Sequence, residues 1–374
     1  MRGISSMSTV RITTKSQSYD VVVQTGLRHH VYDLLKQNEI GNHSSILVIT
    51  DEHVYPLYAS DVVASFPEDT RIYTEVVPAG EASKSFDVFK RLQERALELG
   101  LDRHSIIIAL GGGVIGDLAG FVAASYMRGI RFIQVPTTLL AHDSSVGGKV
   151  AINLPQAKNI VGAFYQPELV IYDTEMLRSL PELEWRSGFA EVIKHGFIRD
   201  HQFLKWLTEH VHSFVDLRDD VLEEILVRSI GVKAAIVKED EREQSVRAFL
   251  NLGHTLGHAI EAELGYGKLA HGEAVAIGMV FALRLSEQKF KIDLPINQLL
   301  VWLRQLGYQT TIPDGLKPQQ LLASMKKDKK NTSGHIRMVL LKEVADVVLT
   351  EVSDELLLQS LTYAIKEGFD GPWN

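Results

Sequence analysis

Histidines and one carboxylate carry the clearest chemical signal in the chain. His254 and His258, in the segment NLGHTLGHAIEAE, are four residues apart, so on a helix both imidazoles share one face and can reach one ion. His271 begins another helical pattern, and Glu191 interrupts an apolar one, where an unpaired acid is costly to bury. One carboxylate with two or three imidazoles suits Zn²⁺ or a similar divalent ion. Spacing alone favours His254 and His258 as the paired ligands, while a solvated histidine pair and a surface Glu191 remain alternatives.

Cationic and amide side chains accompany these potential ligands. Several such groups with few acids between them would suit a substrate that carries phosphate and carboxylate. Taken singly, each lysine is more typical of a solvated surface residue than of a functional one, so the cluster matters more than its members. The group consists of Lys149, Asn153, Lys158, Asn159, Lys194, Lys233, Arg247 and Asn251.

Glycines follow an apolar strand pattern in the first half of the chain. The run Ile106–Leu110 leads directly into GGGVIGD (111–117) and then into a helical pattern. Glycines let a backbone approach a pyrophosphate, and a helix N-terminus offers free N–H groups. GEASK (80–84) and Thr137–Thr138 also follow strand patterns, at the sheet edge where open α/β sheets bind ligands. The alternatives are a merely tight turn, a surface Glu81–Lys84 pair and a threonine helix cap.

The patterns around these residues predict two domains. Short apolar strands at 45–50, 71–77, 105–110 and 131–136 alternate with helical stretches, which indicates a mostly parallel, Rossmann-like sheet covered on both faces. From about residue 181, helical periodicity takes over at 182–195, 221–238, 257–264 and 273–288, with one late strand or hairpin at 336–341. We therefore predict an α/β nucleotide-binding domain at 1–180 and a mainly helical metal- and substrate-binding domain at 181–374, with a cleft between two lobes as the default expectation for 374 residues.

Composition excludes several classes of function. The formal net charge of −8 provides no broad basic surface for nucleic acid. Apolar runs are too short for a membrane helix, and the N-terminus lacks the apolar core of a secretory signal, so we expect a cytoplasmic protein with no membrane partner. With no cysteine, disulfides and thiolate chemistry are excluded, and any metal must be held by His, Asp or Glu.

Nine motifs give the chain a specific resemblance. They are GGGVIGD (111–117), YMRG (126–129), VPTTLLA (135–141), DSSVGGKVAIN (143–153), KNIVGAFYQP (158–167), AEVIKHG (190–196), DERE (240–243), RAFLNLGHTLGHAIE (247–261) and HGEAVAIGM (271–279). In order and spacing they resemble the 3-dehydroquinate synthases, over about residues 45–340. One departure is a loop at 141–143 that is one residue shorter than in most of the family, which affects the expected role of Asp143 and makes His142 an unusual residue at this place.

The resemblance implies a ligand set that differs from the one favoured by spacing. It places zinc, or cobalt, on Glu191, His254 and His271, and leaves His258 to the substrate. It implies an NAD site formed by Glu81, Lys84, Gly112, Gly113, Val114, Ile115, Gly116, Asp117, Thr137, Thr138, Asp143, Lys149, Lys158, Met176, Leu177, Arg178 and Ser179. Substrate contacts and catalysis would fall to Lys149, Asn159, Lys194, Lys233, Glu243, Arg247, Asn251 and His258, with Arg128 from a homodimer mate and a lysine of 325–330.

The reaction implied by the resemblance is the second step of the shikimate pathway. A phosphorylated heptulosonate, 3-deoxy-D-arabino-heptulosonate 7-phosphate, would become 3-dehydroquinate and phosphate through transient oxidation by NAD, elimination, reduction and an intramolecular aldol closure. Three rival interpretations stay open: a metal polyol dehydrogenase of the glycerol dehydrogenase kind, another sugar-phosphate cyclase, and a non-catalytic binding protein. The intact DSSVGGK and NLGHTLGHAIE segments argue against the second.

Overall fold

The chain forms two compact units. The computed structural model describes residues 7–265, 267–327, 336–371 and 373. Unit 1 comprises Met1–Leu180 together with Arg218–Arg242, and unit 2 comprises Pro181–Leu217 together with Glu243–Asn374. The prediction had assigned all residues after 180 to a second domain, so the return of Arg218–Arg242 to unit 1 is a difference from it. Within the described residues, no helix has both the length and the apolar character needed to span a bilayer.

A seven-stranded sheet forms the centre of unit 1, with the strand order β1-β2-β9-β6-β5-β3-β4. All neighbours are parallel except β1 and β2, which form an antiparallel hairpin. The four strands expected from the sequence are present as β3 to β6, whereas β1, β2 and β9 were not predicted. The bounds are β1 Ser8–Thr13, β2 Ser18–Gln24, β3 Ile46–Asp51, β4 Ile72–Val77, β5 Ile106–Gly111, β6 Arg131–Pro136 and β9 Leu169–Asp173.

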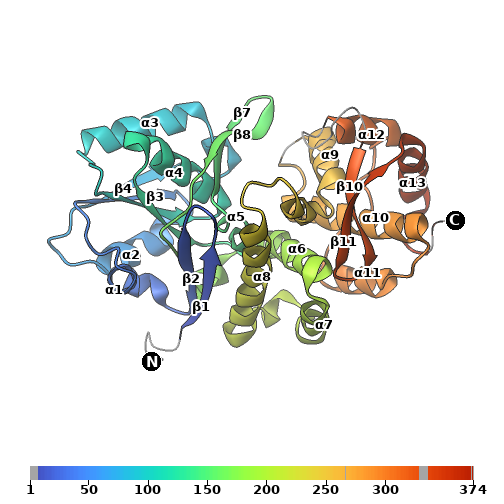
Figure 1. Ribbon diagram of the computed structural model, residues 1–374, viewed down its shortest axis with the longest axis horizontal. Helices are drawn as coiled ribbons and strands as arrows, with labels where there is room; N and C mark the ends of the chain where they lie inside the picture. The colour runs from blue at the N-terminus through green and yellow to red at the C-terminus, as the bar shows by residue number, and fades with distance from the viewer. Residues whose placement is uncertain (1–6, 266, 328–335, 372, 374) are drawn as a thin grey trace. The chain divides into compact units, whose positions relative to one another are not determined.

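Helices cover both faces of this sheet (Figure 1). Alternate residues of β5 explain why: Ile106 and Ile108 enter a core with α1 (Val31–Gln37) and α2 (Ser60–Ala64), while Ile107 enters the opposite core. The second core is completed by helices α3, Phe86–Glu98, and α4, Gly113–Ser125. An all-apolar strand is stable only with both faces buried, which confirms the predicted Rossmann-like arrangement.

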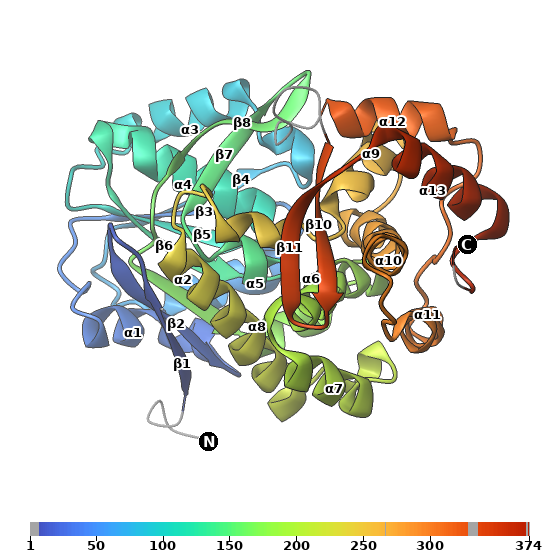
Figure 2. The ribbon, with the colours of Figure 1, turned by 45° about the vertical axis from the view of Figure 1, so that its right-hand side comes forward.

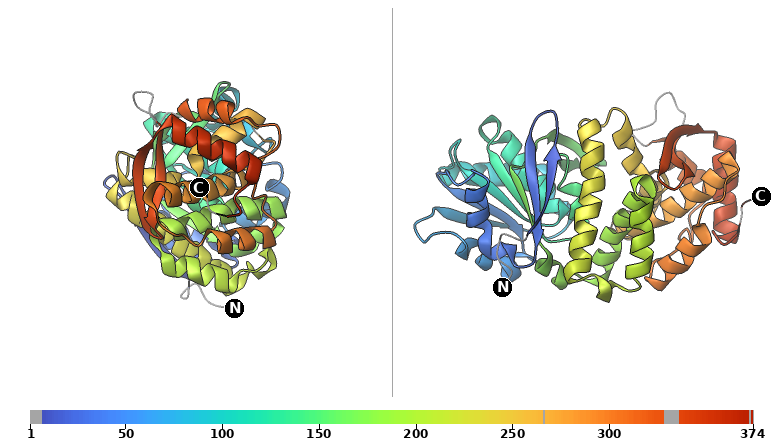
Figure 3. Two further views of the ribbon diagram at one scale, coloured as in Figure 1. Left: turned by 90° about the vertical axis from the view of Figure 1, so that its right-hand side faces the viewer. Right: turned by 60° about the horizontal axis from the view of Figure 1, so that its bottom comes forward.

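Helix α8, Asp219–Glu239, belongs to unit 1 because it packs on the β1–β2 hairpin. Figure 3 shows the helix, in yellow, alongside the blue hairpin. Leu222, Ile225 and Ile230 of α8 are fully or almost fully buried. The remaining elements of unit 1 are η2 Leu27–His30, η3 Tyr55–Ala59, η4 Glu81–Ser83, η5 Tyr126–Arg128, α5 Ala141–Ser144, the hairpin of β7 Lys149–Leu154 and β8 Ala157–Phe164, and η6 Thr174–Ser179.

Helix α10, His271–Phe290, is the core of unit 2. Residues 274–283 of α10 are buried all round, and α6, α9, α11 and strand β10 pack against the helix (Figure 2). A helix without a polar face requires such complete enclosure. The other elements are α6 Glu182–Arg199, α7 His201–His210, η7 Phe214–Asp216, η8 Val246–Asn251, α9 His254–Leu264, α11 Ile296–Gln305, α12 Pro318–Lys326, β10 Ile336–Glu343, β11 Asp346–Val352 and α13 Asp354–Glu367.

Candidate metal centre and nucleotide site

Three helices of unit 2 bring four potential ligands together. Glu191 comes from α6, His254 and His258 from α9, and His271 from the first position of α10. One ring nitrogen from each histidine lies within 4.8 Å of the others. The Oε1 atom of Glu191 is 3.4 Å from His254 Nε2 and 3.7 Å from His271 Nε2. These separations are compatible with atoms that share one cation.

Glycines allow these helices to approach so closely. A Cβ atom on Gly272 would stand 2.0 Å from the Ser187 carbonyl oxygen of α6, and one on Gly278 would stand 2.0 Å from the Gly253 carbonyl oxygen. Gly253 also has a φ of +83°, which favours glycine at this position just before α9. The backbones of α6, α9 and α10 therefore touch at glycines, and this contact sets the spacing of the four ligand side chains.

The charges of this cluster fit a divalent cation. Glu191 is only 1% exposed and forms an ion pair with Lys194, one turn along α6. Its Oε1 atom accepts no hydrogen bond from any residue that the structure describes. A buried carboxylate oxygen in that position is costly unless a cation occupies the space beside it. The donor set, one carboxylate and imidazole nitrogens, matches the preference of Zn²⁺ or Co²⁺.

The orientation of the rings distinguishes two of the histidines. His254 turns Nε2 toward Glu191 while its Nδ1 lies 3.3 Å from the Leu252 carbonyl oxygen. His271 also turns Nε2 toward Glu191, and its Nδ1 lies 3.1 Å from Glu261 Oε2. Burial by itself would lower the pKa of His271, but the hydrogen bond and charge of Glu261, together with the charge of Glu191, raise that pKa above its ordinary value. An acceptor on Nδ1 that frees Nε2 is the usual support of a metal-ligating histidine.

The remaining predicted residues of unit 2 lie on or beside η8. Arg247 is 1% exposed, and Asn251 Nδ2 donates to Glu243 Oε1 at 3.2 Å and to the Ala248 carbonyl at 3.0 Å. Glu243 has a φ of +57°, an unfavourable backbone conformation for a residue with a Cβ. Of the predicted lysine stretch 325–330, residues 328–330 lie outside the described residues.

Lys84 is the centre of a polar network in unit 1. The side chain is 4% exposed, and its Nζ donates to Asp117 Oδ2 at 2.6 Å and to Asn159 Oδ1. Glu81 Oε1 lies 3.6 Å from the same Nζ and accepts a hydrogen bond from Asn153 Nδ2 at 2.7 Å. Burial raises the pKa of Asp117, and the Lys84 ammonium opposes that rise. The network joins η4, α4 and the β7–β8 hairpin, so residues assigned to cofactor and to substrate meet here.

The glycine turn is also built for close packing. A Cβ on Gly112 would meet Thr138 Cγ2 at 2.8 Å, and one on Gly116 would meet Gln134 Oε1 at 2.8 Å. Thr138 Oγ1 accepts from the Ala141 N–H at 3.3 Å, but the N-cap of α5 is Leu140, so Thr138 does not occupy the cap position considered from the sequence. Gly112 is the N-cap of α4, and Gly113 begins that helix. GEASK forms a short 3-10 turn, and α3 begins only at Phe86.

Several predicted residues of unit 1 occupy strained or buried positions. Arg128 and Asn159 have φ values of +69° and +55°. Asp143 Oδ2 is 3.2 Å from Lys233 Nζ, which also contacts the Asp143 carbonyl. The side chains of Ile115, Met176 and Leu177 are fully buried in apolar cores, so only their backbone can face a cofactor. Among the other predicted residues of unit 1, Thr137 is buried, Gly113, Val114 and Lys158 are half-buried, and Lys149 and Arg178 are exposed.

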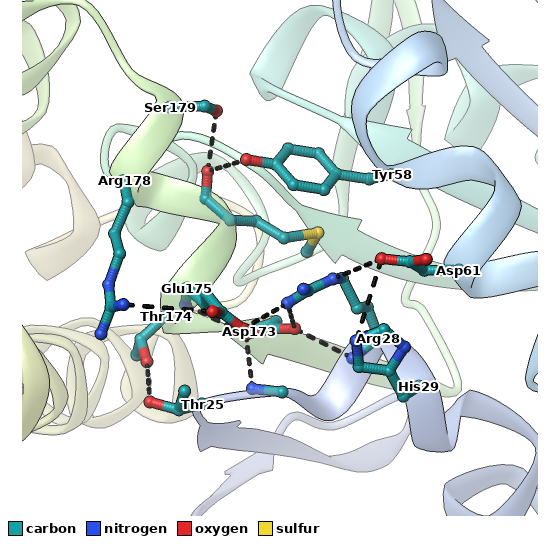
Figure 4. A network of polar contacts seen from close by, with 12 residues as sticks. Thr25, Arg28, His29, Tyr58, Asp61, Asp173, Thr174, Glu175, Arg178 and Ser179 are labelled. Carbon is teal, nitrogen blue, oxygen red and sulfur yellow. Dashed lines mark hydrogen bonds and ion pairs between the residues drawn. The ribbon is translucent and has the colours of Figure 1, made fainter.

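Arg28 is a residue that sequence reasoning missed, and it fixes the turn η6 that contains 176–179. Its guanidinium contacts Asp61 at 2.9 Å, Asp173 at 3.0 Å and Glu175 at 2.8 Å (Figure 4). Asp173 is fully buried and also accepts the backbone N–H groups of Gly26 and Glu175. Burial by itself would lower the pKa of Arg28, but these acids raise it above its ordinary value. No local sequence spacing reveals this network, because its members are up to 147 residues apart.

Comparison with solved structures defines the class of protein. A 2-deoxy-scyllo-inosose synthase complexed with carbaglucose-6-phosphate, NAD⁺ and Co²⁺ superposes with a TM-score of 0.85 and 26% identity, covering 95% of this chain and 99% of that one. A 2-epi-5-epi-valiolone synthase from Streptomyces hygroscopicus with NAD⁺ and Zn²⁺ gives 0.84 and 25%, covering 94% and 97%. A Schizosaccharomyces pombe glycerol dehydrogenase, at 0.67 and 15%, covering 93% and 89%, shares the fold alone. The fold is that of the dehydroquinate synthase-like enzymes.

Sequence comparison identifies the family within that class. Residues 74–187 match the model of the 3-dehydroquinate synthase N-terminal region, and residues 188–331 match that of the C-terminal region. The 3-dehydroquinate synthase of Halalkalibacterium halodurans is 54% identical over 367 residues, covering 96% of this chain and 99% of the relative. The chain belongs to the 3-dehydroquinate synthase family.

Proposed function

We propose that this chain converts 3-deoxy-D-arabino-heptulosonate 7-phosphate into 3-dehydroquinate and phosphate, with NAD and a divalent metal ion. Family membership at 54% identity supports the activity. The observation that carries the chemistry is the buried Glu191 carboxylate facing the Nε2 atoms of His254 and His271. Buried charged groups that converge in this way are typical of functional sites.

In this proposal Glu191, His254 and His271 hold the metal, and His258 is left to the substrate. In both of these metal-assigned histidines Nδ1 lies beside an acceptor and Nε2 lies toward Glu191, so Nε2 is the ligand atom. A bound divalent ion would supply polarisation of a substrate hydroxyl, and bound NAD would supply reversible hydride acceptance without net consumption. The His258 ring, 5.3 Å from that of His254 between centroids, holds or moves a proton near the substrate.

We assign the anionic groups of the substrate to buried cationic side chains. Lys194 and Arg247 in unit 2 are each 1% exposed, and Lys233 in unit 1 is 5% exposed. Buried cations interact more strongly with phosphate or carboxylate than solvated ones, because water screens them less. We assign Lys149, Asn159 and Asn251 to the same substrate contacts.

NAD binds, in this proposal, at the carboxyl ends of β4, β5 and β6. The N-terminus of α4 offers its backbone N–H groups to the pyrophosphate. Glu81, Lys84, Asp117 and Thr138 surround that turn, and Asp143, Lys158 and the backbone of 176–179 complete the cofactor set. The Lys84–Asp117 pair fixes the start of α4 and so positions the turn.

The decisive test is phosphate release from the heptulosonate phosphate in the presence of NAD. We expect release that stops when a chelator removes metal and returns when Zn²⁺ or Co²⁺ is restored. NADH should not accumulate, because the hydride returns to the product. Net NADH formation from a simple polyol, without phosphate release, would instead establish a dehydrogenase.

The ligand assignment has its own test. His271→Ala should lose both bound metal and activity, whereas His258→Ala should keep the metal and lose rate. Metal content is measured by elemental analysis of the purified proteins after dialysis. An equal loss of metal in the two variants would refute the assignment of His258 to the substrate.

We also propose a homodimer in which Arg128 acts on the partner's substrate. Met127 is 39% exposed and the adjacent Arg128 is also exposed, so this segment is accessible to a partner chain. Sedimentation should give twice the chain mass. Mixing inactive Arg128→Ala and His271→Ala proteins should restore partial activity through mixed dimers, whereas a monomer or an Arg128 that acts within its own chain would restore none.

A further inference from the structure

One imidazole of the metal-type cluster lies between two buried carboxylates. His271 Nδ1 is 3.1 Å from Glu261 Oε2, while Nε2 of the same ring is 3.7 Å from Glu191 Oε1. Glu261 is 4% exposed and Glu191 is 1% exposed. A carboxylate is expensive to bury, so a second one on the far side of the ring needs a physical reason.

His271 needs more support than its counterpart His254. The His271 side chain is 31% exposed and begins helix α10, whereas that of His254 is 13% exposed. His254 has its Nδ1 beside a neutral backbone carbonyl, that of Leu252. The backbone at His271 is held by the Gly272 N–H, which donates to Ser187 Oγ at 3.1 Å, but that bond does not restrain the ring.

We infer that Glu261 is the positioning residue of His271: it accepts the Nδ1 proton, keeps Nε2 aimed at Glu191, and strengthens Nε2 as a donor to a divalent cation. The inference deepens the proposed function and rests on it. A carboxylate on the outer nitrogen fixes both the tautomer and the direction of a ligating imidazole, and makes that imidazole more basic. An imidazole free to flip would spend part of its time with the wrong nitrogen toward the ion.

Helix α9 then carries two different supports for the site. His254 supplies a ligand, and Glu261, seven residues later on the same helix, orients the ligand supplied by α10. A separation of seven residues places both on one helix face. The packing of α9 against α10 at Gly253 and Gly278 therefore fixes both relationships at once.

The test compares metal affinity among four variants: Glu261→Ala, Glu261→Gln, Glu263→Gln and His271→Ala. Glu263 is a matched control, because it is an exposed glutamate two residues further along α9. Zn²⁺ dissociation constants are measured by competition with a chromogenic chelator. We expect Glu261→Ala to weaken binding by about 10- to 100-fold. Glu261→Gln should weaken binding less, because an amide oxygen still accepts the Nδ1 proton, and Glu263→Gln should leave it unchanged.

A second measurement separates positioning from general stability. Melting temperatures are recorded for each variant without metal and with saturating Co²⁺, along with the visible spectrum of bound Co²⁺. A positioning role shrinks the metal-induced rise in melting temperature and shifts the spectrum. A merely structural role lowers both melting temperatures equally and leaves their difference and the spectrum intact, which would overturn the inference.

The His271→Ala variant distinguishes a failure of the proposed metal site from a failure of the role inferred for Glu261. If His271→Ala retains wild-type metal affinity, the metal site of the proposed function is wrong. If His271→Ala loses the metal but Glu261→Ala binds it as tightly as the wild type, the metal site stands and only the role of Glu261 is refuted.

Discussion

The metal-type cluster of unit 2 and the Lys84 network of unit 1 are built on opposite principles. In unit 2, glycines let three helices touch. These backbone contacts fix the distances between the helices, so ligand side chains from distant parts of the sequence converge. In unit 1, loops at the ends of parallel strands are tied by side-chain pairs such as Lys84–Asp117. The first site therefore depends on glycines where helix backbones meet, and the second depends on paired side chains beside its glycine turn.

This difference governs how each site responds to substitution. Added atoms should damage unit 2, where there is no room between backbones. Removed atoms should damage unit 1, where a buried charge would lose its counter-charge. Four substitutions test the contrast, beginning with the largest expected effect.

Gly278→Ala should be the most damaging single change. Its Cβ would stand 2.0 Å from the Gly253 carbonyl oxygen, so α9 and α10 must separate. We expect a loss of about 3 kcal/mol in the free energy of unfolding, at the upper end of overpacking costs, together with loss of bound metal. Urea unfolding and metal analysis measure the two effects. Unchanged metal affinity would show that helix contact does not set the cluster.

Arg28→Ala should destabilise unit 1 by roughly 2–3 kcal/mol, because it leaves the fully buried Asp173 without its guanidinium. Asp173 retains backbone N–H donors, which moderates the loss. Urea unfolding followed by far-ultraviolet circular dichroism provides the measurement. Arg11→Ala, which removes an exposed ion pair with Asp20, is the control and should cost less than about 1 kcal/mol. Equal effects of the two changes would contradict the role assigned to the Arg28 network.

Lys84→Met should weaken NAD binding by about tenfold, or about 1.4 kcal/mol, because the start of α4 loses the ion pair that holds it. Titration calorimetry with NAD measures the dissociation constant. Lys90, whose side chain is 75% exposed in a pair with Glu94, gives the matched Lys90→Met control. The NAD dissociation constant of Lys90→Met should equal that of the wild type. A tenfold loss of NAD affinity in this control would contradict a specific role for Lys84.

Gly231→Ala should stabilise the protein slightly. This helical glycine of α8 has no atom within 4 Å of a built Cβ, so alanine adds no clash. Replacing glycine by alanine inside a helix gains roughly 0.5–1 kcal/mol. Thermal unfolding checks the gain. A loss at this position would mean that glycine here serves a purpose other than close packing.

The sequence allowed the sheet of unit 1 to be predicted better than its edges. Strands β3 and β5 are almost entirely apolar, and β4 and β6 keep a majority of apolar residues, whereas β1 alternates half-buried and exposed residues over most of its six positions. Helix α8 was predicted at 221–238 and spans Asp219–Glu239. Its periodicity identifies a helix but not the unit against which it packs, because an apolar helix face fits any apolar surface.

In the candidate site too, contacts within one helix could be predicted from the sequence, whereas contacts between helices could not. Spacing on one helix links His254 to His258, and the structure does place their rings side by side. Spacing could not link Glu261 to His271, because that contact depends on how α9 meets α10. Nor could it reveal that Arg128, Asn159 and Glu243 share left-handed backbone conformations, since none is a glycine or lies in a turn motif.

The path of the chain limits how this protein can be divided or recombined. The polypeptide changes units after residues 180, 217 and 242, so neither unit is one continuous segment. A fragment that ends at residue 180 would lack α8 and leave the apolar side of its N-terminal hairpin bare to solvent. The break between the two family matches, at 187 and 188, falls inside α6. Each unit is built from two separate segments of the chain. Gene fusions and fragment exchanges between relatives should therefore succeed only when they carry both segments of a unit together.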